Sequence, residues 1–458
     1  MSDLNYKSWN EECAVVGVYN IQDASNIAYY SLFAMQHRGQ EASGISTSDN
    51  KKLFITKNKG LVTEVFNKEI LCNLKGNNAI GHNRYATAGE DSSADAQPVF
   101  ANYDLGQVAI VHNGNITNAK EIKDELIKEG AIFQSHMDTE VLIHLIAKSK
   151  QQTLTDRLKE TIPKLKGAFC FIILSRTKMF VIRDRNAFRP LSLGEITNKD
   201  GTKGYIVASE TCAFDLVGAT HIRDVEAGEM LVFDKQKIQS HIIMQEDPYP
   251  CVFEYVYFAR PDSKVFGRLV YDIRKSMGME LAKENPVDAD IVIPVPDSGV
   301  AAALGYSKQS GIPFELGIIR NHYVGRTFIE PTQEIRELKV RLKLNPIKEI
   351  IKDKKIIVID DSIVRGTTSK QIVKILRDCG AKEIHMKISS PPTISPCYYG
   401  VDTPTKSELI SANMSNDEVC KYIGANSLSF LSLEGLKNSI GDGNYKFCQA
   451  CFDGKYIV

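Results

Sequence analysis

Cys13 is the residue whose position most directly points to chemistry. It follows a polar leader of twelve residues and precedes an apolar run. If residues 1–12 were removed, one residue would carry both a thiol and an α-amine. Their ordinary pKa values are about 8.5 and about 7.7–8.0, so the amine can accept a proton while the sulfur attacks a carbonyl. The alternative is a buried cysteine at the start of a strand, and the motifs farther along the chain decide between the two.

A second chemical pattern spans residues 356–368, where an apolar strand ends in two adjacent aspartates and a small-residue turn leads into a helix. Backbone N–H groups and hydroxyls at a helix N-terminus form an anion cradle, while the aspartates can hold ribose hydroxyls or a hydrated Mg²⁺. An acidic turn capped by a threonine is the structural alternative. The whole run favours a site for a phosphorylated sugar. Its predicted binding residues are Asp360, Asp361, Ser362, Arg365, Gly366, Thr367 and Thr368.

Another loop also follows an apolar strand and precedes a small-residue helix. Its central residues, Asp297, Ser298 and Gly299, would let the backbone approach a diphosphate and its metal closely. Taken alone, such a sequence is usually only a turn. Farther on, residues 320–328 are cationic and aromatic and contain a glycine. This composition is consistent with a mobile lid around Arg326 and also with a solvated basic loop.

Four cysteines of the second half form a possible ligand set: Cys251, Cys397, Cys448 and Cys451. The last two make a Cys-x-x-Cys pair near the C-terminus. Zinc at four thiolates, an iron–sulfur cluster, a redox dithiol and ordinary buried cysteines all remain open from the residues alone. The scattered cysteines are expected to be core or incidental thiols, namely Cys72, Cys170, Cys212, Cys379 and Cys420.

The elements that must position these residues differ between the two halves. Short β-rich segments cover residues 14–19, 108–112, 169–174, 180–183, 205–208 and 230–233. Helical patterns cover residues 27–36, 119–129 and 138–149. This segregation predicts a layered α+β sandwich of two sheets with helices outside.

After residue 250 the pattern becomes strand, loop, helix, first at 291–307 and again at 356–378. Such repetition predicts a parallel α/β domain. The two prolines within residues 246–250 mark the best boundary. We therefore divide the chain into a leader, 1–12, a first domain, 13–246, and a second domain, 247–458.

Composition limits the functional classes. At 458 residues, with 43% hydrophobic and 24% charged residues, the chain is long enough for two globular domains. Lys plus Arg and Asp plus Glu both total 56, so no net field favours nucleic acid or an anionic membrane. The leader has no apolar core and no stretch reaches spanning length, which makes the cytoplasm the expected compartment.

Four further motifs complete the first half, at residues 36–41, 81–87, 112–115 and 135–140. With Cys13 they resemble the signatures of class II, N-terminal-nucleophile glutamine amidotransferases. The run at 356–368 resembles the phosphoribosylpyrophosphate motif of type I phosphoribosyltransferases. Over essentially its full length the chain is similar to the glutamine phosphoribosylpyrophosphate amidotransferase family. The resemblance implies an αββα N-terminal-nucleophile hydrolase sandwich followed by an α/β type I phosphoribosyltransferase domain.

The resemblance also implies roles in the first half. Arg84 would clamp the α-carboxylate of glutamine and Asp138 would pair with its α-ammonium. The Asn113 amide and the Gly114 N–H would form an oxyanion hole. Arg38 would support the bound substrate nearby. Because Asn-Gly is also the strongest signal of a type I′ hairpin, we expect Asn113 and Gly114 at a hairpin tip.

The activity implied by the family couples two reactions. Cys13, exposed by autocatalytic removal of residues 1–12, would release ammonia from glutamine. The ammonia would pass through a tunnel to phosphoribosylpyrophosphate and yield 5-phosphoribosylamine, the committed step of purine synthesis. The implied cofactors are one Mg²⁺ per subunit, at Ser298, Asp360 and Asp361, and one [4Fe-4S] cluster at the four cysteines of the second half. Purine nucleotides as feedback inhibitors and a homotetramer are further expectations.

Two rival functions remain in view. A non-catalytic sensor could use the second half to bind phosphoribosylpyrophosphate or nucleotides, but the complete Cys13 motif set argues against it. Another amidotransferase could pass nitrogen to a hexose phosphate or an adenylated aspartate. Both of those acceptors require a different partner domain from one with the Asp360-Asp361 motif.

Overall fold

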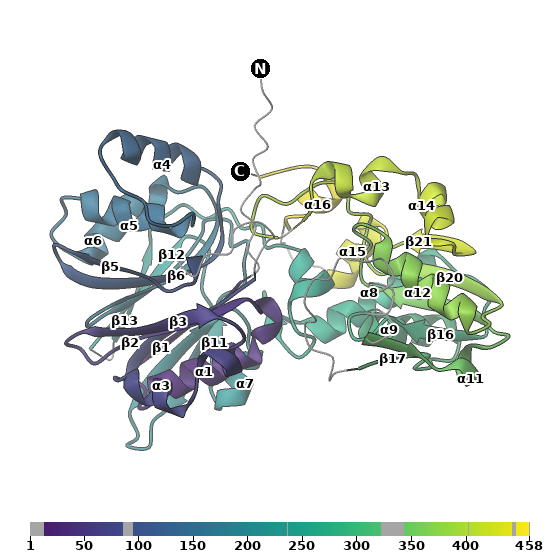
Figure 1. Cartoon of the computed structure of the whole chain (residues 1–458), viewed down its shortest axis with the longest axis horizontal. Helices are drawn as coiled ribbons and strands as arrows, with labels where there is room; N and C mark the ends of the chain where they lie inside the picture. Colours follow the sequence, from purple (N-terminus) through teal and green to yellow (C-terminus); the bar gives the residue numbers. More distant parts are fainter. Residues whose placement is uncertain are drawn as a thin grey trace.

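The computed structural model describes residues 13–85, 95–235, 237–321, 343–401, 403–441 and 446–457. The predicted leader, 1–12, and the predicted lid residue Arg326 lie outside these ranges. The first half contains two stacked sheets with helices outside, and the second half contains a smaller sheet flanked by helices (Figure 1).

One sheet of the first half has seven strands in the order β11-β9-β10-β1-β4-β2-β3. The other has six, in the order β13-β12-β8-β7-β6-β5. The strands of the seven-stranded sheet are β1 (Cys13–Tyr19), β2 (Ala42–Ser48), β3 (Leu53–Lys59), β4 (Asn78–Arg84), β9 (Ser192–Thr197), β10 (Lys203–Ala208) and β11 (Thr220–Asp224). Those of the six-stranded sheet are β5 (Val99–Tyr103), β6 (Gly106–Ile116), β7 (Gly167–Ser175), β8 (Met179–Arg183), β12 (Glu229–Asp234) and β13 (Lys237–Ile242).

Helices cover the outer face of each sheet. On the seven-stranded side lie α1 (Ala24–Ala34), the 3₁₀ turn η1 (Gln36–Arg38), α2 (Val62–Val65), α3 (Lys68–Asn73) and α7 (Cys212–Val217). On the six-stranded side lie α4 (Ala119–Lys128), α5 (Thr139–Lys148), α6 (Leu154–Thr161) and η3 (Ile162–Lys164). The predicted αββα sandwich is therefore confirmed.

Strand β1 shows why this sequence forms an inner strand. Successive side chains of a strand point to opposite faces. Val15 and Tyr19 enter the core between the two sheets, whereas Val16 and Val18 pack with the helices outside. Because both faces are covered, the strand is apolar on both sides, and every residue from Cys13 to Tyr19 is buried.

The second half is built on a parallel sheet in the order β16-β19-β20-β21. Its strands are β16 (Ile291–Pro294), β19 (Lys355–Asp360), β20 (Glu383–Ile388) and β21 (Ser427–Phe430). One face is covered by α8 (Val270–Glu284), α9 (Val300–Ser310) and α15 (Leu433–Ile440). The other is covered by α12 (Thr367–Asp378) and α14 (Asn416–Ile423). This arrangement confirms the predicted α/β domain.

Shorter elements complete the second half. Two small ribbons pair β14 (Lys264–Val265) with β15 (Arg268–Leu269) and β17 (Ile318–Arg320) with β18 (Leu344–Pro346). The π-helical turn η4 (Glu254–Phe258) follows the junction between the halves. The remaining short helices are α11 (Lys348–Ile351), η5 (Lys406–Glu408), α13 (Ile410–Asn413) and α16 (Ala450–Asp453).

The junction between the halves is in close contact with the first half. Strand β13 ends at Ile242, and residues 243–250 contain neither helix nor strand. The predicted boundary after residue 246 lies in this segment and stays a prediction. The N–H groups of Asp247 and Cys251 donate to the carbonyls of Arg185 and Phe188, at 2.8 and 3.0 Å.

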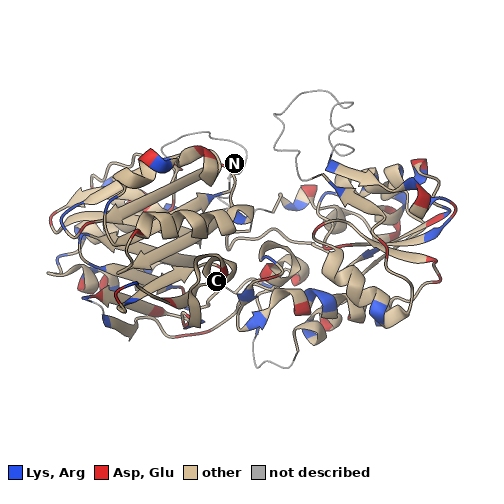
Figure 2. Cartoon of the chain, turned by 90° about the horizontal axis from the view of Figure 1, so that it is seen from below, with Lys and Arg blue, Asp and Glu red and all other residues tan. Residues whose placement is uncertain are grey.

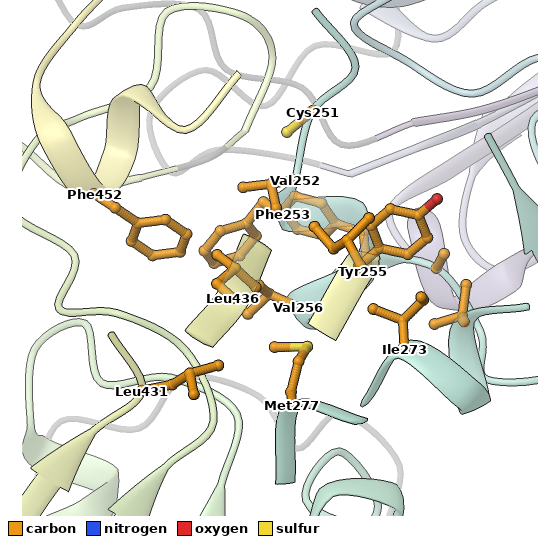
Figure 3. Packing of buried hydrophobic residues seen from close by; sticks show 14 of the residues in the cluster. Cys251, Val252, Phe253, Tyr255, Val256, Ile273, Met277, Leu431, Leu436 and Phe452 are labelled. Carbon is orange, nitrogen blue, oxygen red and sulfur yellow. The ribbon is translucent and has the colours of Figure 1, made fainter. Parts of the chain in front are cut away.

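One hydrophobic cluster joins this junction to the C-terminal elements. Val252 and Phe253 lie beside side chains such as Leu436 and Phe452, and Cys251 belongs to the same cluster (Figure 3). The Phe253 and Phe452 rings lie 6.0 Å apart between centroids. The C-terminal part of the chain is therefore packed into the core at the junction.

Charged residues of both signs are interspersed along both halves (Figure 2). This distribution agrees with the equal totals of basic and acidic residues in the sequence. Among the helices of the described ranges, none has the length and apolar character required to cross a membrane.

One expectation from the sequence is wrong. Asn113 and Gly114 lie inside β6, opposite Cys170 and Phe169 of β7, and not at a hairpin tip. A Cβ on Gly114, which has φ +141°, would lie 2.1 Å from the carbonyl oxygen of Ala168. The glycine is therefore required for a close approach of two strands, and the Asn-Gly pair serves no turn.

Candidate active site

Cys13 is the first residue of β1 and is fully buried. Its Cα partner on the neighbouring strand β4 is Arg84, so the predicted nucleophile and the predicted carboxylate clamp are adjacent. The Nε of Arg38 donates to the Cys13 carbonyl at 3.1 Å. Gly39 follows, and a Cβ there would lie 2.6 Å from the Arg84 backbone. The turn that carries Arg38 is thus packed directly against the end of β4.

Two predicted glutamine ligands have opposite charges. The Nη1 of Arg84 lies 3.9 Å from the Oδ2 of Asp95. Asp138 precedes α5, and its Oδ2 accepts from the Ile116 N–H at 2.8 Å. Burial alone would raise the pKa of Asp138, but the charge and hydrogen bond of His112 and the Ile116 N–H hold this pKa below its ordinary value. Asp138 is therefore ionised at neutral pH, as pairing with an ammonium requires.

The oxyanion-hole candidate contains an unsatisfied amide. Asn113 is fully buried, and neither its Oδ1 nor its Nδ2 has a hydrogen-bond partner in the part of the chain that the structure describes. Such a group costs free energy, so native structures rarely leave it without a partner. A bound ligand that presents an oxygen would satisfy the Nδ2 donor. This observation fits a place for the developing oxyanion beside Gly114.

His82 ties the two sheets together at this end. Its Nε2 lies 3.0 Å from the carbonyl oxygen of His112, so β4 of one sheet meets β6 of the other. Burial lowers the pKa of His82 to about 3, and the ring is therefore neutral. The contact places Asn113 and Gly114 on the strand that faces the Cys13 and Arg84 end of the first sheet. His82 belongs to the motif at residues 81–87, for which the sequence predicted a role only at Arg84.

The two phosphate-type loops of the second half lie together. Strands β16 and β19 pair in parallel, with Pro294 opposite Ile359, so the loops that follow them leave the same edge of the sheet. A Cβ on Gly299 would lie 2.3 Å from the Ile359 carbonyl oxygen, which explains the glycine there. The Ser298 side chain lies close enough to the Asp360 carboxylate to interact with it. The residues predicted to share a metal are thus brought together.

Asp360 and Asp361 are both buried, at 7% and 6% exposure. Burial and the charge of Asp361 raise the pKa of Asp360 well above its ordinary value. Two carboxylates in this position would be stabilised by a cation or by hydroxyl donors. Hard oxygen donors are the ligands that Mg²⁺ prefers, so the residues fit the predicted ion.

Helix α12 begins where the anion cradle was predicted. Gly366 precedes it with φ +73°, and a Cβ there would lie 2.7 Å from the Ile410 side chain. Thr367 and Thr368 form the exposed first turn of α12, so their N–H groups and hydroxyls can reach a ligand. Arg365 is exposed and pairs with Glu408 at 3.1 Å.

A cleft of about 290 Å³ connects the two halves. Asp297 and Ser298 line it from the phosphate-type loop, and His37 and Arg38 line it from the first half. Residues 257–261 form the wall between them. Because Arg38 also donates to the Cys13 carbonyl, the cleft runs from the phosphate-type loop to a residue that contacts the predicted nucleophile.

The four cysteines of the second half are all buried, at 6–8% exposure. The backbones of Cys251 and Cys448 pair in an isolated parallel β-bridge. Burial raises the pKa of Cys451 well above its ordinary value, and the nearby Cys251, Cys397 and Cys448 raise it further. Burial raises the pKa of the Cys251 thiol to about 12. In the described ranges, no three His, Cys, Asp or Glu side chains are close enough to hold a single metal ion. The structure thus brings the four predicted cysteines into one buried cluster.

Arg189 lies near these cysteines. It is buried at 1% exposure, and its charge interacts with the Cys251 and Cys397 thiols. Within the described residues, its Nε and Nη2 have no hydrogen-bond partner. A buried cation with unsatisfied donors beside Cys251 and Cys397 fits the predicted anionic group bound by thiolates.

The segment that carries Cys397 also reaches the oxyanion strand. The Nδ2 of Asn115 donates to the Tyr398 carbonyl at 2.8 Å. A Cβ on Gly400 would lie 2.9 Å from the carbonyl carbon of Gly114. The Phe188 and Tyr399 rings stack at 4.3 Å between centroids. Residues 397–401 therefore form a wall against the predicted oxyanion hole, which no sequence motif indicated.

Two glutamates near Cys13 were also missed. Glu210 and Glu254 are fully buried and both contact Arg38, at 2.7 and 2.8 Å. They lie 172 and 216 positions from Arg38 in the sequence. A lone glutamate beside a helix gives no signal at such separations.

Comparisons with known proteins agree with this geometry. A family model described as a glutamine amidotransferase domain matches residues 82–215, and a phosphoribosyl transferase domain matches residues 264–389. The chain is 49% identical to the amidophosphoribosyltransferase of Bacillus subtilis, over 98% of this chain and 95% of that protein. It is 49% identical to the chloroplastic amidophosphoribosyltransferase 2 of Arabidopsis thaliana, over 98% and 80%.

Solved structures agree as well. The B. subtilis glutamine phosphoribosylpyrophosphate amidotransferase in complex with ADP and GMP superposes with a TM-score of 0.91, at 48% identity and 97% coverage of both chains. A structure described as the allosteric regulatory enzyme of purine biosynthesis gives 0.92, at 49% identity, 97% coverage of this chain and 96% of that one.

The fold and the site thus define a glutamine amidotransferase joined to a phosphoribosyltransferase. More particularly, the chain belongs to the amidophosphoribosyltransferase family. It transfers the amide nitrogen of glutamine to phosphoribosylpyrophosphate, which gives 5-phosphoribosylamine, glutamate and pyrophosphate.

Proposed function

We propose that Cys13, exposed by removal of residues 1–12, is the nucleophile of the glutamine half-reaction. Its thiol would attack the glutamine amide and form a thioester, with the α-amine as proton acceptor. Arg84 and Asp138 would hold the two ends of the amino acid. Asn113 Nδ2 and the Gly114 N–H would stabilise the oxyanion, because both are fixed in place before the substrate binds.

In the second half, we propose that phosphoribosylpyrophosphate binds at the shared edge of β16 and β19. The first turn of α12 would receive the 5-phosphate, Asp360 and Asp361 the ribose hydroxyls, and residues 297–299 the pyrophosphate. Ammonia would travel through the cleft from Arg38 toward Ser298, sheltered from bulk water. Closure of the segment around Arg326 over the acceptor is part of the same proposal.

The cofactors remain proposals. Mg²⁺, one per subunit, would be held by Ser298, Asp360 and Asp361, where it would neutralise charge on the leaving pyrophosphate. A [4Fe-4S] cluster, one per subunit, would be held by the four buried cysteines of the second half as a structural or oxygen-sensing group. Arg189 would balance part of the negative charge of its thiolates.

We propose the regulation and assembly that the family resemblance implies. The solved relative that contains ADP and GMP supports purine nucleotides as inhibitors, and nucleoside monophosphates share the ribose phosphate that the α12 site would recognise. We therefore propose competitive inhibition at that site. A homotetramer that works in the cytoplasm completes the proposal.

The observation that carries the proposal is the cleft that runs from Ser298 to Arg38, the residue hydrogen-bonded to Cys13. The test is the variant Cys13→Ala, assayed with glutamine and with ammonium chloride as nitrogen donors. We expect glutamine-dependent phosphoribosylamine formation to vanish and ammonia-dependent formation to remain. Equal loss of both activities would show that the two sites do not divide the reaction in this way.

A further inference from the structure

A buried ionic bridge joins the two halves beside Cys13. It consists of Arg38 and Arg189, both from the first half, with Glu210 from the first half and Glu254 from the second. Arg38 Nη1 lies 2.7 Å from Glu210 Oε1, Arg38 Nη2 lies 2.8 Å from Glu254 Oε1, and Arg189 Nη1 lies 3.1 Å from Glu254 Oε1. All four side chains are at most 3% exposed.

Glu210 connects this bridge to the wall of the cleft. Its Oε1 contacts His37 Nε2 at 2.8 Å, and its Oε2 accepts from the Ser263 hydroxyl at 2.6 Å and from the Arg260 N–H at 2.9 Å. Arg260 lines the cleft that leads to the phosphate-type loop. One carboxylate therefore contacts both Arg38 and the second half.

Glu254 makes the reciprocal connection. Its two oxygens each accept from one terminal nitrogen of Arg38 at 2.8 Å, a bidentate geometry. The π-helical turn that it begins continues into Tyr257 and Phe258 of the cleft wall. The orientation of Arg38, whose Nε holds the Cys13 carbonyl, is thus determined by groups from both halves.

The ion pairs of this bridge favour the charged forms of Arg38 and Glu210. Burial alone would lower the pKa of Arg38, but the charges of Glu254 and Glu210 raise it well above its ordinary value. Burial alone would raise the pKa of Glu210, but His37 and Arg38 hold it well below its usual range. Buried ion pairs are often no more stabilising than apolar packing, so a role beyond stability is a reasonable explanation for this one.

Resting on the proposed use of Cys13 as nucleophile, we propose that Glu210 and Glu254 are positioning residues for glutamine cleavage. They hold Arg38 so that its Nε fixes the Cys13 carbonyl, and they connect this contact to the cleft wall at residues 257–263. Neither glutamate needs to touch the substrate. Their loss should slow the attack by Cys13 without weakening glutamine binding, which depends on Arg84 and Asp138.

The test is Glu254→Gln, which preserves the shape of the side chain and removes its charge. We expect the kcat for glutamine hydrolysis to fall at least ~tenfold, while the KM for glutamine changes less than ~threefold. Ammonia-dependent activity should stay within ~twofold of wild type, because the acceptor residues are unchanged. Glu210→Gln should show the same division.

Glu229→Gln is the matched control. Glu229 is equally buried, at 1% exposure, and its two oxygens pair with Arg223 at 2.7 and 2.8 Å on another strand of the same half. The variant disrupts a bidentate Glu–Arg pair that does not contact Arg38, although the Arg223 side chain is 36% exposed. Its kcat and KM should both stay within ~twofold of wild type even if the melting temperature falls.

Comparing the two glutamate variants with Cys13→Ala distinguishes a failure of the positioning role from a failure of the proposed function. If Glu254→Gln and Glu210→Gln keep wild-type kcat while Cys13→Ala abolishes glutamine use, the positioning role is refuted and the function stands. Glutamine use that survives Cys13→Ala refutes the function itself.

If Glu254→Gln does not fold, Arg38→Lys replaces it as the test variant. A lysine keeps the charge but lacks the Nε and fork contacts, so the same kcat loss is expected and a wild-type kcat contradicts the proposal.

Discussion

Gly400→Ala tests whether the wall at residues 397–401 shapes the oxyanion hole. Gly400 has φ +88°, and an alanine Cβ there would lie 2.9 Å from the Gly114 carbonyl carbon and 3.0 Å from its Cα. An ordinary carbon–carbon contact is ~3.5 Å, so one of the two segments must move by about 0.6 Å. Displacement of that size would misplace the Gly114 N–H relative to the proposed position of the oxyanion.

The expected loss of glutamine-dependent kcat can be estimated from the effect of removing an oxyanion-hole donor. Complete removal of an oxyanion-hole donor lowers kcat by about 10²–10³. A partial displacement of Gly114 should therefore lower glutamine-dependent kcat by roughly tenfold. Ammonia-dependent activity does not use the oxyanion hole and should stay near wild type. The assay is steady-state kinetics with each nitrogen donor, together with thermal unfolding.

Gly424→Ala provides the matched control. Gly424 has φ +79°, nearly the same backbone conformation, but the nearest atom to a Cβ there is a Val373 methyl carbon at 3.9 Å. Both variants should lose about 1 kcal/mol through the unfavourable positive φ. Only Gly400→Ala should lose glutamine-dependent turnover. Equal kinetics in the two variants would refute the contact between residues 397–401 and the oxyanion hole.

Three further variants test the site. Asn113→Ala removes an unsatisfied buried amide, so we expect unchanged or higher stability of the ligand-free protein with a glutamine-dependent kcat about 10²-fold lower; a small kinetic effect would exclude Asn113 from the oxyanion hole. The pKa of Asp360 is higher in the folded protein than in the unfolded chain. Its contribution to the free energy of unfolding is therefore fully present below the unfolded pKa and is lost as the pH rises through the folded pKa. Asp360→Asn should therefore raise the thermal midpoint of ligand-free protein at pH 7–8 yet abolish transfer with either nitrogen donor, and a lowered midpoint would contradict the electrostatic account. Cys448→Ser should lower the iron content and the thermal midpoint together, measured by iron analysis and calorimetry, whereas a fully stable, fully active protein without iron would contradict the cluster proposal.

Much of the architecture could be predicted because its signals are local. The predicted strands 14–19 and 356–359 correspond to β1 (Cys13–Tyr19) and β19 (Lys355–Asp360), each to within one residue at either end. An apolar run that ends in small or acidic residues predicts a strand followed by a loop at the edge of a sheet. This prediction does not require knowing which strand is its neighbour. The assignment of Ser298 and Asp360 to one metal site came from the family resemblance, and the structure brings the two residues together.

The remaining features depend on contacts between distant segments. Arg38 meets Glu254 across 216 positions, and Gly400 meets Gly114 across the junction of the two halves. Neither partner carries a local pattern. Asn113-Gly114 shows the opposite failure, since a strong local turn signal was overridden by pairing with β7. Local sequence patterns therefore located Cys13 and the two phosphate-type loops, while contacts between distant segments determine how these two parts of the site are connected.

The most direct test of the central claim measures glutamate and pyrophosphate release from anaerobically purified protein. The protein is given glutamine and Mg²⁺ with phosphoribosylpyrophosphate, and each substrate is then omitted in turn. The cleft between Arg38 and Ser298 predicts equimolar release that requires both substrates. Glutamate release without pyrophosphate, or no product from processed and iron-replete protein, would contradict a coupled transfer between the two halves.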